Sequence, residues 1–405
     1  MKKYLFILLA VMGLAVRIYF LTRPGFFPDM ESWRKWAVSI SESGLFWAYT
    51  GNSGINYPPV YLGILWGMHA LGRIFGISFG TLDGWSGVLF KLPPLIFDIG
   101  VVFVLAIIVW KLTKNFDQAA LAGLIYWMNP AVVFIGTAWG QVDSVPTFFL
   151  LLALYTLLTG KLSRMGFWLG FALATKVQTV VVWPVFFMLL FRRSVPETIK
   201  SLGVLVGTLI VIHAPFIIAG QGSRLMDVYF GSVGFVTSLS HNAWNLWWPI
   251  ERITHLPDTG AFFIHPWMTL SYRQVGFGLL GVSIAALCLR VKTRWVPREA
   301  VALLSGALLS FFILPTQIHE RYAFPAVVFL GLYAVLEKRW ILFISASLLL
   351  LANLVYVFPL HAVIGRGVSW STILYKEEFG FYAAFVFVFI FVEFFREIIL
   401  RRKSY

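Results

Sequence analysis

The sequence predicts an all-α fold, a polytopic transmembrane helical bundle of about 11–13 spans. Only 12% of the 405 residues are charged, and 59% are hydrophobic. Soluble domains carry roughly twice that share of charge, and the mean hydropathy here is +0.82. Apolar runs long enough to cross a bilayer recur along the chain. We therefore expect 1–405 to form a single integral-membrane domain.

The first apolar run follows Lys2 and Lys3, as it would in a signal peptide. No small-residue cleavage pattern follows; Arg17, Arg23 and Pro24 occur instead, so we expect a retained helix with a cytoplasmic N-terminus. The candidate spans are 4–22, 58–76, 89–110, 118–137, 142–159, 166–190, 198–219, 274–290, 299–316, 322–336, 340–358 and 379–396.

Basic residues between the apolar runs predict the orientation. The strongest clusters are Arg192 and Arg193; Arg290, Lys292, Arg294 and Arg298; Lys338 and Arg339; and Arg401, Arg402 and Lys403. The span count places all of them inside, as the positive-inside rule requires, and places 23–57, 220–273, 317–321 (with Arg321) and 359–378 (with Arg366) outside. We predict a multi-pass protein of a prokaryotic plasma or cytoplasmic membrane with its active site on the external face.

The net charge of +14 fits the same bias and contact with anionic membrane lipids, so we predict no nucleic-acid partner. Cys288 is the only cysteine. Without a disulfide framework or zinc spacing, we predict no metal site and no cofactor.

The orientation is less regular between 77 and 190. Four cations would be external there against the bias: Lys111, Lys114, Lys161 and Arg164. Asn129-Pro130, Pro146 and Lys176 are helix-breaking or polar at membrane depth. Broken or re-entrant helices that line a cavity would explain both observations.

The first outer loop, 23–57, carries an unusual group of charges. Its residues 30–43 place Trp33, Trp36, Ala37 and Ile40 on one side at helical spacing. This pattern predicts a helix on the outer membrane surface with its tryptophans at the headgroups. The sequence Tyr57-Pro58-Pro59 then forces a turn into the next span.

Asp29 and Glu31 lie two positions apart at the start of this helix, so their side chains point to nearly opposite sides. One carboxylate is then a candidate base, while the other can pair with Arg34. Asp29, at the loop-to-helix junction, is the better candidate to face a substrate. The alternative is that Asp29 only caps the helix.

His319-Glu320-Arg321 forms a polar cluster between two apolar runs. An Arg and a His at a membrane face can hold a phosphate through charge-assisted hydrogen bonds. The alternative is an interfacial anchor in which Glu320 and Arg321 neutralise each other.

Several other polar residues lie at membrane depth or in the long outer loop. Asp98, Asp143 and Lys176 are ionisable groups in apolar segments, which suggests either function or internal pairing of Lys176 with Asp98 or Asp143. His241 and Asn242 offer hydrogen bonds for a sugar beside aromatic faces. Their alternative is an ordinary loop held by interfacial aromatic residues.

Taken together, these motifs resemble the GT-C superfamily of polyprenyl-phosphate-sugar-dependent glycosyltransferases. The run from Phe27 to Trp36 looks like the first-loop motif of the dolichyl-phosphate-glucose glucosyltransferases, and Tyr57-Pro58-Pro59 and His319-Glu320-Arg321 match the same group. The motif Trp139-Gly140-Gln141-Val142-Asp143-Ser144, with Lys176 and Gln178, resembles prokaryotic relatives of the second mannosyltransferase of GPI-anchor synthesis.

The resemblance implies roles for these residues. Asp29 corresponds to the loop base and His319 to the residue that contacts the donor phosphate, while Arg321 stands where the eukaryotic enzymes often have Lys. We assign Glu31 to the catalytic pair and Lys176 to the donor phosphate. Substrate-binding candidates are Arg34, Tyr57, Gln141, Asp143, Gln178, His241 and Asn242. The loop 23–57 would be catalytic, and 220–273 would bind donor and acceptor.

The chemistry is simple because a lipid phosphate is already a good leaving group. A base must take the proton of the acceptor hydroxyl, and fixed cations must stabilise the departing phosphate. A single displacement inverts the anomeric centre and requires no metal. The expected partners are a polyprenyl-phosphate-linked hexose (mannose or glucose) and a lipid- or glycan-linked acceptor.

Two other functions stay open. A transporter or flippase of lipid-linked saccharide could use Asp98, Asp143 and Lys176 as a relay, although such proteins often show paired halves that this sequence lacks. An O-antigen polymerase or ligase would need large outer loops rich in Arg. The loop 220–273 has three Arg residues, balanced by three acidic ones.

Overall fold

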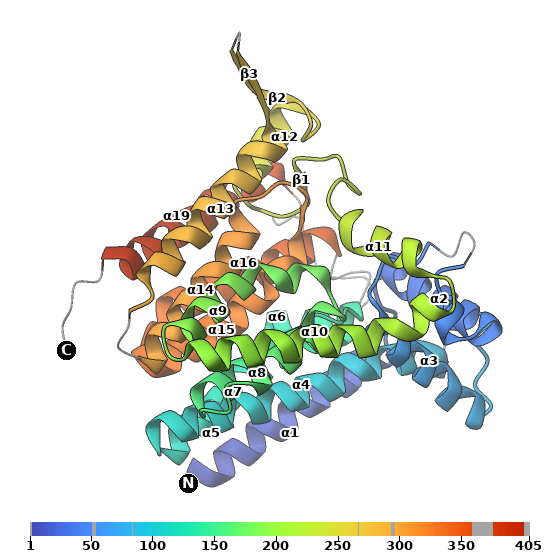
Figure 1. The fold of residues 1–405 in the computed structure, drawn as a ribbon. Helices are drawn as coiled ribbons and strands as arrows, with labels where there is room; N and C mark the ends of the chain where they lie inside the picture. Colours follow the sequence, from blue (N-terminus) through green and yellow to red (C-terminus); the bar gives the residue numbers. More distant parts are fainter. Residues whose placement is uncertain are drawn as a thin grey trace. The chain divides into compact units, whose positions relative to one another are not determined.

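The computed structural model describes residues 2–50, 54–82, 84–265, 267–292, 296–358 and 376–400 (Figure 1). Among them the fold is almost entirely helical, with two pairs of short strands as the exception. The chain forms two compact units. The first consists mainly of Met1–Val180 and Pro196–Ser232, and the second of Val181–Val195, Val233–His361 and Arg366–Tyr405.

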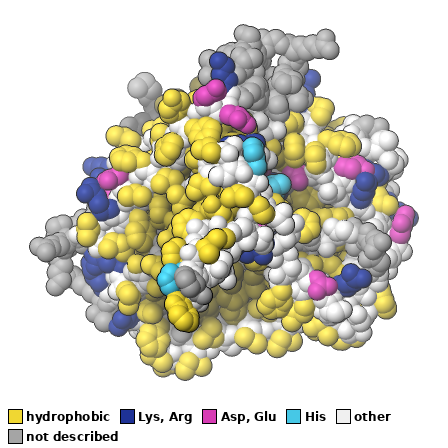
Figure 2. All heavy atoms as spheres, turned by 90° about the horizontal axis from the view of Figure 1, so that it is seen from above, with side chains coloured by type: hydrophobic (Ala, Val, Ile, Leu, Met, Phe, Trp, Pro, Cys, Tyr) yellow, Lys and Arg dark blue, Asp and Glu magenta, His cyan; other side chains and the backbone are white. Residues whose placement is uncertain are grey.

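Five of the described helices are long and apolar enough to cross a membrane. They are α1 (Lys2–Leu21), α4 (Gly84–Thr113), α10 (Val195–Ile218), α13 (Tyr272–Arg290) and α16 (Trp340–Val357). Each coincides with a predicted apolar run, and hydrophobic side chains cover much of the face in Figure 2. The coarse prediction of a helical protein with membrane-crossing segments is supported, while the count of 11–13 spans and a single domain over 1–405 stay predictions.

The first unit begins with α1, followed by α2 (Phe27–Ser43) and a short 3₁₀ turn, η1 (Leu45–Trp47). Pro28 lies in the first turn of α2 and Pro59 in that of α3 (Pro59–Ile74). Proline suits this position because the first amides of a helix have no intrahelical partner. The predicted helix over 30–43 and the turn at 57–59 are therefore confirmed.

The predicted position of the α2 tryptophans is wrong. Trp33 is 2% exposed and Trp36 is 7% exposed, so neither ring is available to headgroups. Both rings pack against Tyr57, at centroid distances of 5.1 and 5.6 Å. The helical spacing of the apolar face was read correctly, but this face is covered by protein.

Helix breaks occur between 77 and 190, as the sequence predicts. The helix α5 (Phe116–Trp127) is followed by α6 (Pro130–Val133) and the π-helical turn η2 (Phe134–Trp139), with a 48° bend between the two parts. The Asn129 side chain accepts a hydrogen bond from the Ala131 amide at 2.9 Å, capping α6. Pro130 has no amide hydrogen with which to continue α5.

A second break follows α7 (Ser144–Leu158) and α8 (Arg164–Leu173). Lys176 lies between α8 and the 3₁₀ segment η3 (Val177–Val182). Pro146 does not break α7, because it lies in the first turn of that helix. The unit also contains α10 and α11 (Gly222–Phe230), and its α4 packs against α1, α5 and α7.

The second unit contains α9 (Trp183–Phe191), α12 (Trp248–Thr254), α13, α14 (Pro297–Ile313), η4 (Glu320–Ala323), α15 (Phe324–Glu337), α16 and α19 (Glu377–Leu400). Strand β1 (Ser240–His241) pairs in parallel with β4 (Ile318–His319). Strands β2 (Ala261–His265) and β3 (Met268–Ser271) form an antiparallel hairpin. A Ser271–Gln274 capping box starts α13.

The stretch 220–273, predicted as one long outer loop, therefore contains α11, α12 and three of the short strands. Some residues used for the orientation lie outside the described part of the chain, namely Arg294, Arg366, Arg401, Arg402 and Lys403.

Candidate functional site

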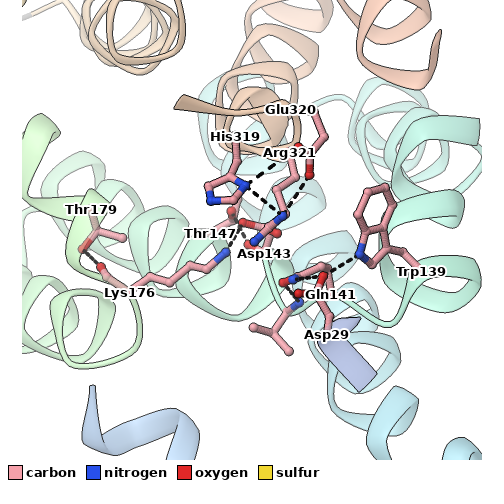
Figure 3. A network of polar contacts seen from close by, with 11 residues as sticks. Asp29, Trp139, Gln141, Asp143, Thr147, Lys176, Thr179, His319, Glu320 and Arg321 are labelled. Carbon is pink, nitrogen blue, oxygen red and sulfur yellow. Dashed lines mark hydrogen bonds and ion pairs between the residues drawn. The ribbon is translucent and has the colours of Figure 1, made fainter. Parts of the chain in front are cut away.

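The carboxylate of Asp29 is held by two side chains from one distant turn. Asp29 is partly exposed and lies in the first turn of α2. Its Oδ2 accepts hydrogen bonds from Trp139 Nε1 at 2.7 Å and from Gln141 Nε2 at 2.6 Å (Figure 3). The N-cap of α2 is Phe26, without a side-chain bond. Asp29 is therefore not the helix cap, and the alternative interpretation is wrong.

The backbone after α6 explains how these donors reach Asp29. The π-helical turn η2 ends at Trp139, and Gly140 follows in a left-handed conformation with φ of 92°. The Gln141 amide then bonds back to the Ile135 carbonyl at 2.9 Å. Trp139 and Gln141 are therefore presented by one fixed turn. Such π-bulges occur frequently at functional sites.

Asp29 and Glu31, the two acidic residues at the start of α2, have different surroundings, as predicted. Glu31 pairs with Arg34 through two bonds of 2.6 and 2.8 Å, and Arg34 also donates to the Phe79 carbonyl at 2.9 Å. The hydrogen bond from Arg34, which outweighs partial burial, lowers the pKa of Glu31 below its ordinary value. Glu31 therefore stays ionised, and its carboxylate is paired with the Arg34 guanidinium.

Lys176 and Asp143 form a buried ion pair of 2.7 Å (Figure 3). Of the alternatives that the sequence left open, internal pairing with Asp143 is confirmed. The Lys176 ammonium also lies 5.7 Å from the centroid of the Tyr57 ring. Oδ2 of Asp143 is buried and has no hydrogen-bond partner among the described residues. Gln178 is partly exposed on η3 in the same unit.

Asp98 is not part of this pair. It lies in α4, where its carboxylate accepts a bond from Tyr126 at 2.6 Å and faces Arg17 at 3.5 Å. Arg17 is fully buried, lies 3.7 Å from the Trp127 ring centroid and donates to the Trp127 carbonyl. A charge within an apolar span could have marked Arg17 from sequence. Pairing with Lys176 was the wrong expectation for Asp98.

In the second unit, the paired strands β1 and β4 bring two predicted site residues together. The ring centroids of His241 and His319 are 4.3 Å apart. Asn242 has φ of 64° and bridges to His319 through the backbone. Its carbonyl accepts a bond of 2.8 Å from Asn353, which sequence reasoning missed. A buried Asn in the apolar α16 was the available signal.

Glu320 and Arg321 form an ion pair of 2.8 Å beside these rings (Figure 3). Burial and the nearby Arg321 charge lower the pKa of His319 to about 4. Burial alone would raise the pKa of Glu320, but the charge of Arg321 and the hydrogen bond to His319 outweigh it, so this pKa falls to about 2. At neutral pH the cluster therefore contains a neutral imidazole, a carboxylate and a guanidinium.

No three His, Cys, Asp or Glu side chains among the described residues come together as a metal-binding set. The polar groups offer a carboxylate that can accept a proton and, in the second unit, a guanidinium and imidazoles that can meet an anion. Comparison with models of known protein families found no match, and neither did comparison with curated proteins.

Proposed function

We propose that the protein is an inverting glycosyltransferase that moves a hexose from a polyprenyl-phosphate donor to a hydroxyl of an acceptor glycan or lipid. The observation that carries the proposal is the Asp29 carboxylate, partly exposed in a very apolar chain and bound through one oxygen by Trp139 and Gln141. The resemblance of the surrounding motif to the GT-C first loop supports the same activity.

In the proposed reaction Asp29 is the general base. The acceptor oxygen attacks the anomeric carbon while its proton moves to Asp29. The bond from that carbon to the phosphate oxygen breaks, and the bonding pair leaves with the polyprenyl phosphate. One displacement on the face opposite the leaving group inverts the anomeric configuration. Glu31, already paired with Arg34, has a supporting role in this scheme.

The departing phosphate needs positive charge and hydrogen-bond donors. We assign these roles to Arg321 and His319, with His319 acting as a neutral donor because its pKa is about 4. Lys176 remains a candidate for the same role, although its ammonium is bound to Asp143. Tyr57, Gln178, His241 and Asn242 are proposed to contact the sugar or the acceptor.

The finer parts of the prediction belong to the same proposal. We propose a GT-C-like bundle of about 11–13 spans, a catalytic first loop at 23–57 and an active site on the non-cytoplasmic face. Mannose and glucose are the proposed hexoses, from the resemblance alone. Support for the membrane setting comes from the five apolar helices.

The test is to incubate the purified protein in detergent with polyprenyl-phosphate-mannose or polyprenyl-phosphate-glucose, with a membrane lipid and glycan extract as the source of acceptor, and to measure which donor is consumed. Asp29→Asn should abolish transfer, whereas the matched Glu31→Gln variant should retain a measurable rate. Full transfer by Asp29→Asn would remove the proposed base. Consumption of neither donor would reject the donor class.

A further inference from the structure

We propose that Trp139 and Gln141 are positioning residues that hold Oδ2 of Asp29 and leave Oδ1 as the atom that receives the acceptor proton. This inference rests on the proposed function, because it needs Asp29 to act as a base. Both N–H groups donate to the same oxygen, at 2.7 and 2.6 Å. Oδ1 accepts no hydrogen bond from the described part of the chain.

Two charge-assisted bonds to one oxygen fix the plane of a carboxylate. Both acceptor sites of Oδ2 are then in use, whereas Oδ1 keeps its own acceptor sites for the proton. The indole N–H of Trp139 and the amide N–H of Gln141 can donate to Asp29, but neither group can take the place of Asp29 as a base. The sequence predicts substrate binding for Gln141, whereas its hydrogen bond to Asp29 favours a role in positioning the base.

The two donors are themselves fixed. Trp139 is fully buried and Gln141 is 1% exposed. The Gln141 Oε1 faces the Val142 amide at 3.3 Å, which is consistent with the amide orientation that directs Nε2 to Asp29. The Trp139 ring packs on Phe26 at 4.5 Å. Rigid donors can hold the carboxylate in place without reorganising during the reaction.

Further hydrogen bonds attach α2 and the residues just before it to the same turn. The Phe26 amide donates to the Trp139 carbonyl at 2.9 Å, and Trp33 Nε1 donates to the Gly140 carbonyl at 3.1 Å. The Lys91 ammonium donates to the Ala138 carbonyl at 3.3 Å and to the Arg23 carbonyl at 2.7 Å. The turn that carries Trp139 and Gln141 therefore holds both the Asp29 side chain and the helix on which Asp29 lies.

Proton transfer fits this arrangement. The O–H bond of the acceptor breaks and a new bond forms between the proton and Oδ1. Oδ2 keeps its two donors while it becomes the carbonyl oxygen of the neutral acid. The donors set the direction in which Oδ1 points, and a misaligned base loses rate rather than affinity.

The kinetic test compares Gln141→Leu and Trp139→Phe with two exposed controls in the same unit, Gln118→Leu and Trp85→Phe. Each positioning variant should lower kcat about tenfold with little change in KM, and the controls should match the wild type. Rescue adds a second readout. Formate should restore part of the activity of Asp29→Gly, and should fail to do so in Asp29→Gly/Gln141→Leu.

A spectroscopic test separates this inference from the proposed function. In protein labelled with ¹⁵N-tryptophan, the indole resonance that disappears in Trp139→Phe should shift in Asp29→Asn. An unshifted resonance, wild-type kcat in both positioning variants, or equal formate rescue with and without Gln141 would overturn the inference. A shifted resonance in a protein that transfers no hexose would reject the proposed function, and the role of Oδ1 with it.

Discussion

Lys176 Nζ lies 2.7 Å from Asp143 Oδ1, and both side chains are buried in the first unit. Each charge would be costly alone in this environment, so the partner explains how the other is tolerated. The pair follows a helix break, where an ammonium can be placed without interrupting a continuous apolar helix. The two roles of Lys176 can be separated by mutation. Stability requires only that neither charge is left unpaired, whereas donor binding requires the ammonium group.

Lys176→Met should destabilise the protein by about 3–5 kcal/mol, because it leaves the Asp143 charge buried and unpaired. The double variant Lys176→Met/Asp143→Leu removes both charges and should recover most of that stability. Thermal unfolding in detergent measures both effects. Equal melting temperatures for the single and double variants would contradict the paired role. If Lys176 also contacts the donor, the stable double variant should still show a raised KM for it.

Stability should fall as the pH is lowered from about 6.5 to about 4. Burial lowers the pKa of His319 to about 4, whereas an unfolded histidine titrates at its ordinary value. Above that ordinary value both states are neutral; below it the unfolded state takes the proton first, so the free energy of unfolding decreases. Burial also lowers the pKa of His241, which adds an effect of the same sign. In the folded state Glu320, with a pKa of about 2, stays ionised throughout this window, and its lowered pKa adds a loss of stability only at the acidic end, where the unfolded glutamate takes up a proton.

The measurement is the melting temperature at several pH values for wild type, His319→Gln and His265→Gln. His319→Gln should reduce the dependence between about pH 4 and 6.5, because a glutamine in the same place cannot take up the proton, while the smaller contribution of His241 remains. His265 lies exposed on β2 and serves as the matched control. A wild-type slope in His319→Gln would show that another group is responsible.

Much of the helical fold could be predicted from sequence because its signals are local. Apolar runs matched the five membrane-length helices, and Asn129-Pro130 marked the break after α5. The pairing of Glu31 with Arg34 followed from their helical spacing. These features depend on residues a few positions apart, for which periodicity and capping rules are sufficient.

The parts that sequence reasoning missed depend on contacts between distant segments. Trp33 and Trp36 were placed at the membrane surface, because periodicity shows which side of a helix is apolar but not what covers it. The bonds from Trp139 and Gln141 to Asp29 join residues more than a hundred positions apart. The pairing of β1 with β4 places His241 beside His319 through two-residue strands, which leave no alternating pattern.

Gly140→Ala should reduce both stability and transfer. Gly140 has φ of 92°, and an added Cβ would lie 2.3 Å from the sulfur of Met30. The left-handed backbone alone costs about 1 kcal/mol for an alanine. Met30 is itself buried, so the short contact should shift both Met30 and the turn that carries Trp139 and Gln141. Gly67→Ala is the control, since its Cβ would meet nothing within 4 Å in α3. Unfolding temperature and kcat should both fall for Gly140→Ala and not for Gly67→Ala. An unchanged kcat in Gly140→Ala would show that the turn does not position Asp29 for the reaction.

The proposed reaction requires Asp29 and His319 to face one substrate. In a displacement the attacking and leaving oxygens lie on opposite sides of one carbon, each about 3 Å away on approach, so the base and the phosphate ligand must come within reach of each other. In a Cys288→Ser background, Asp29→Cys and His319→Cys should be joined by a bifunctional maleimide of about 10 Å, a length chosen from that geometry. Peptide mass spectrometry detects the product. Asp29→Cys with Arg339→Cys is the control, because the positive-inside rule predicts a cytoplasmic position for Arg339. Cross-linking of the control pair but not of the first would reject a shared site, since the carboxylate and the phosphate ligand would then act on opposite sides of the membrane.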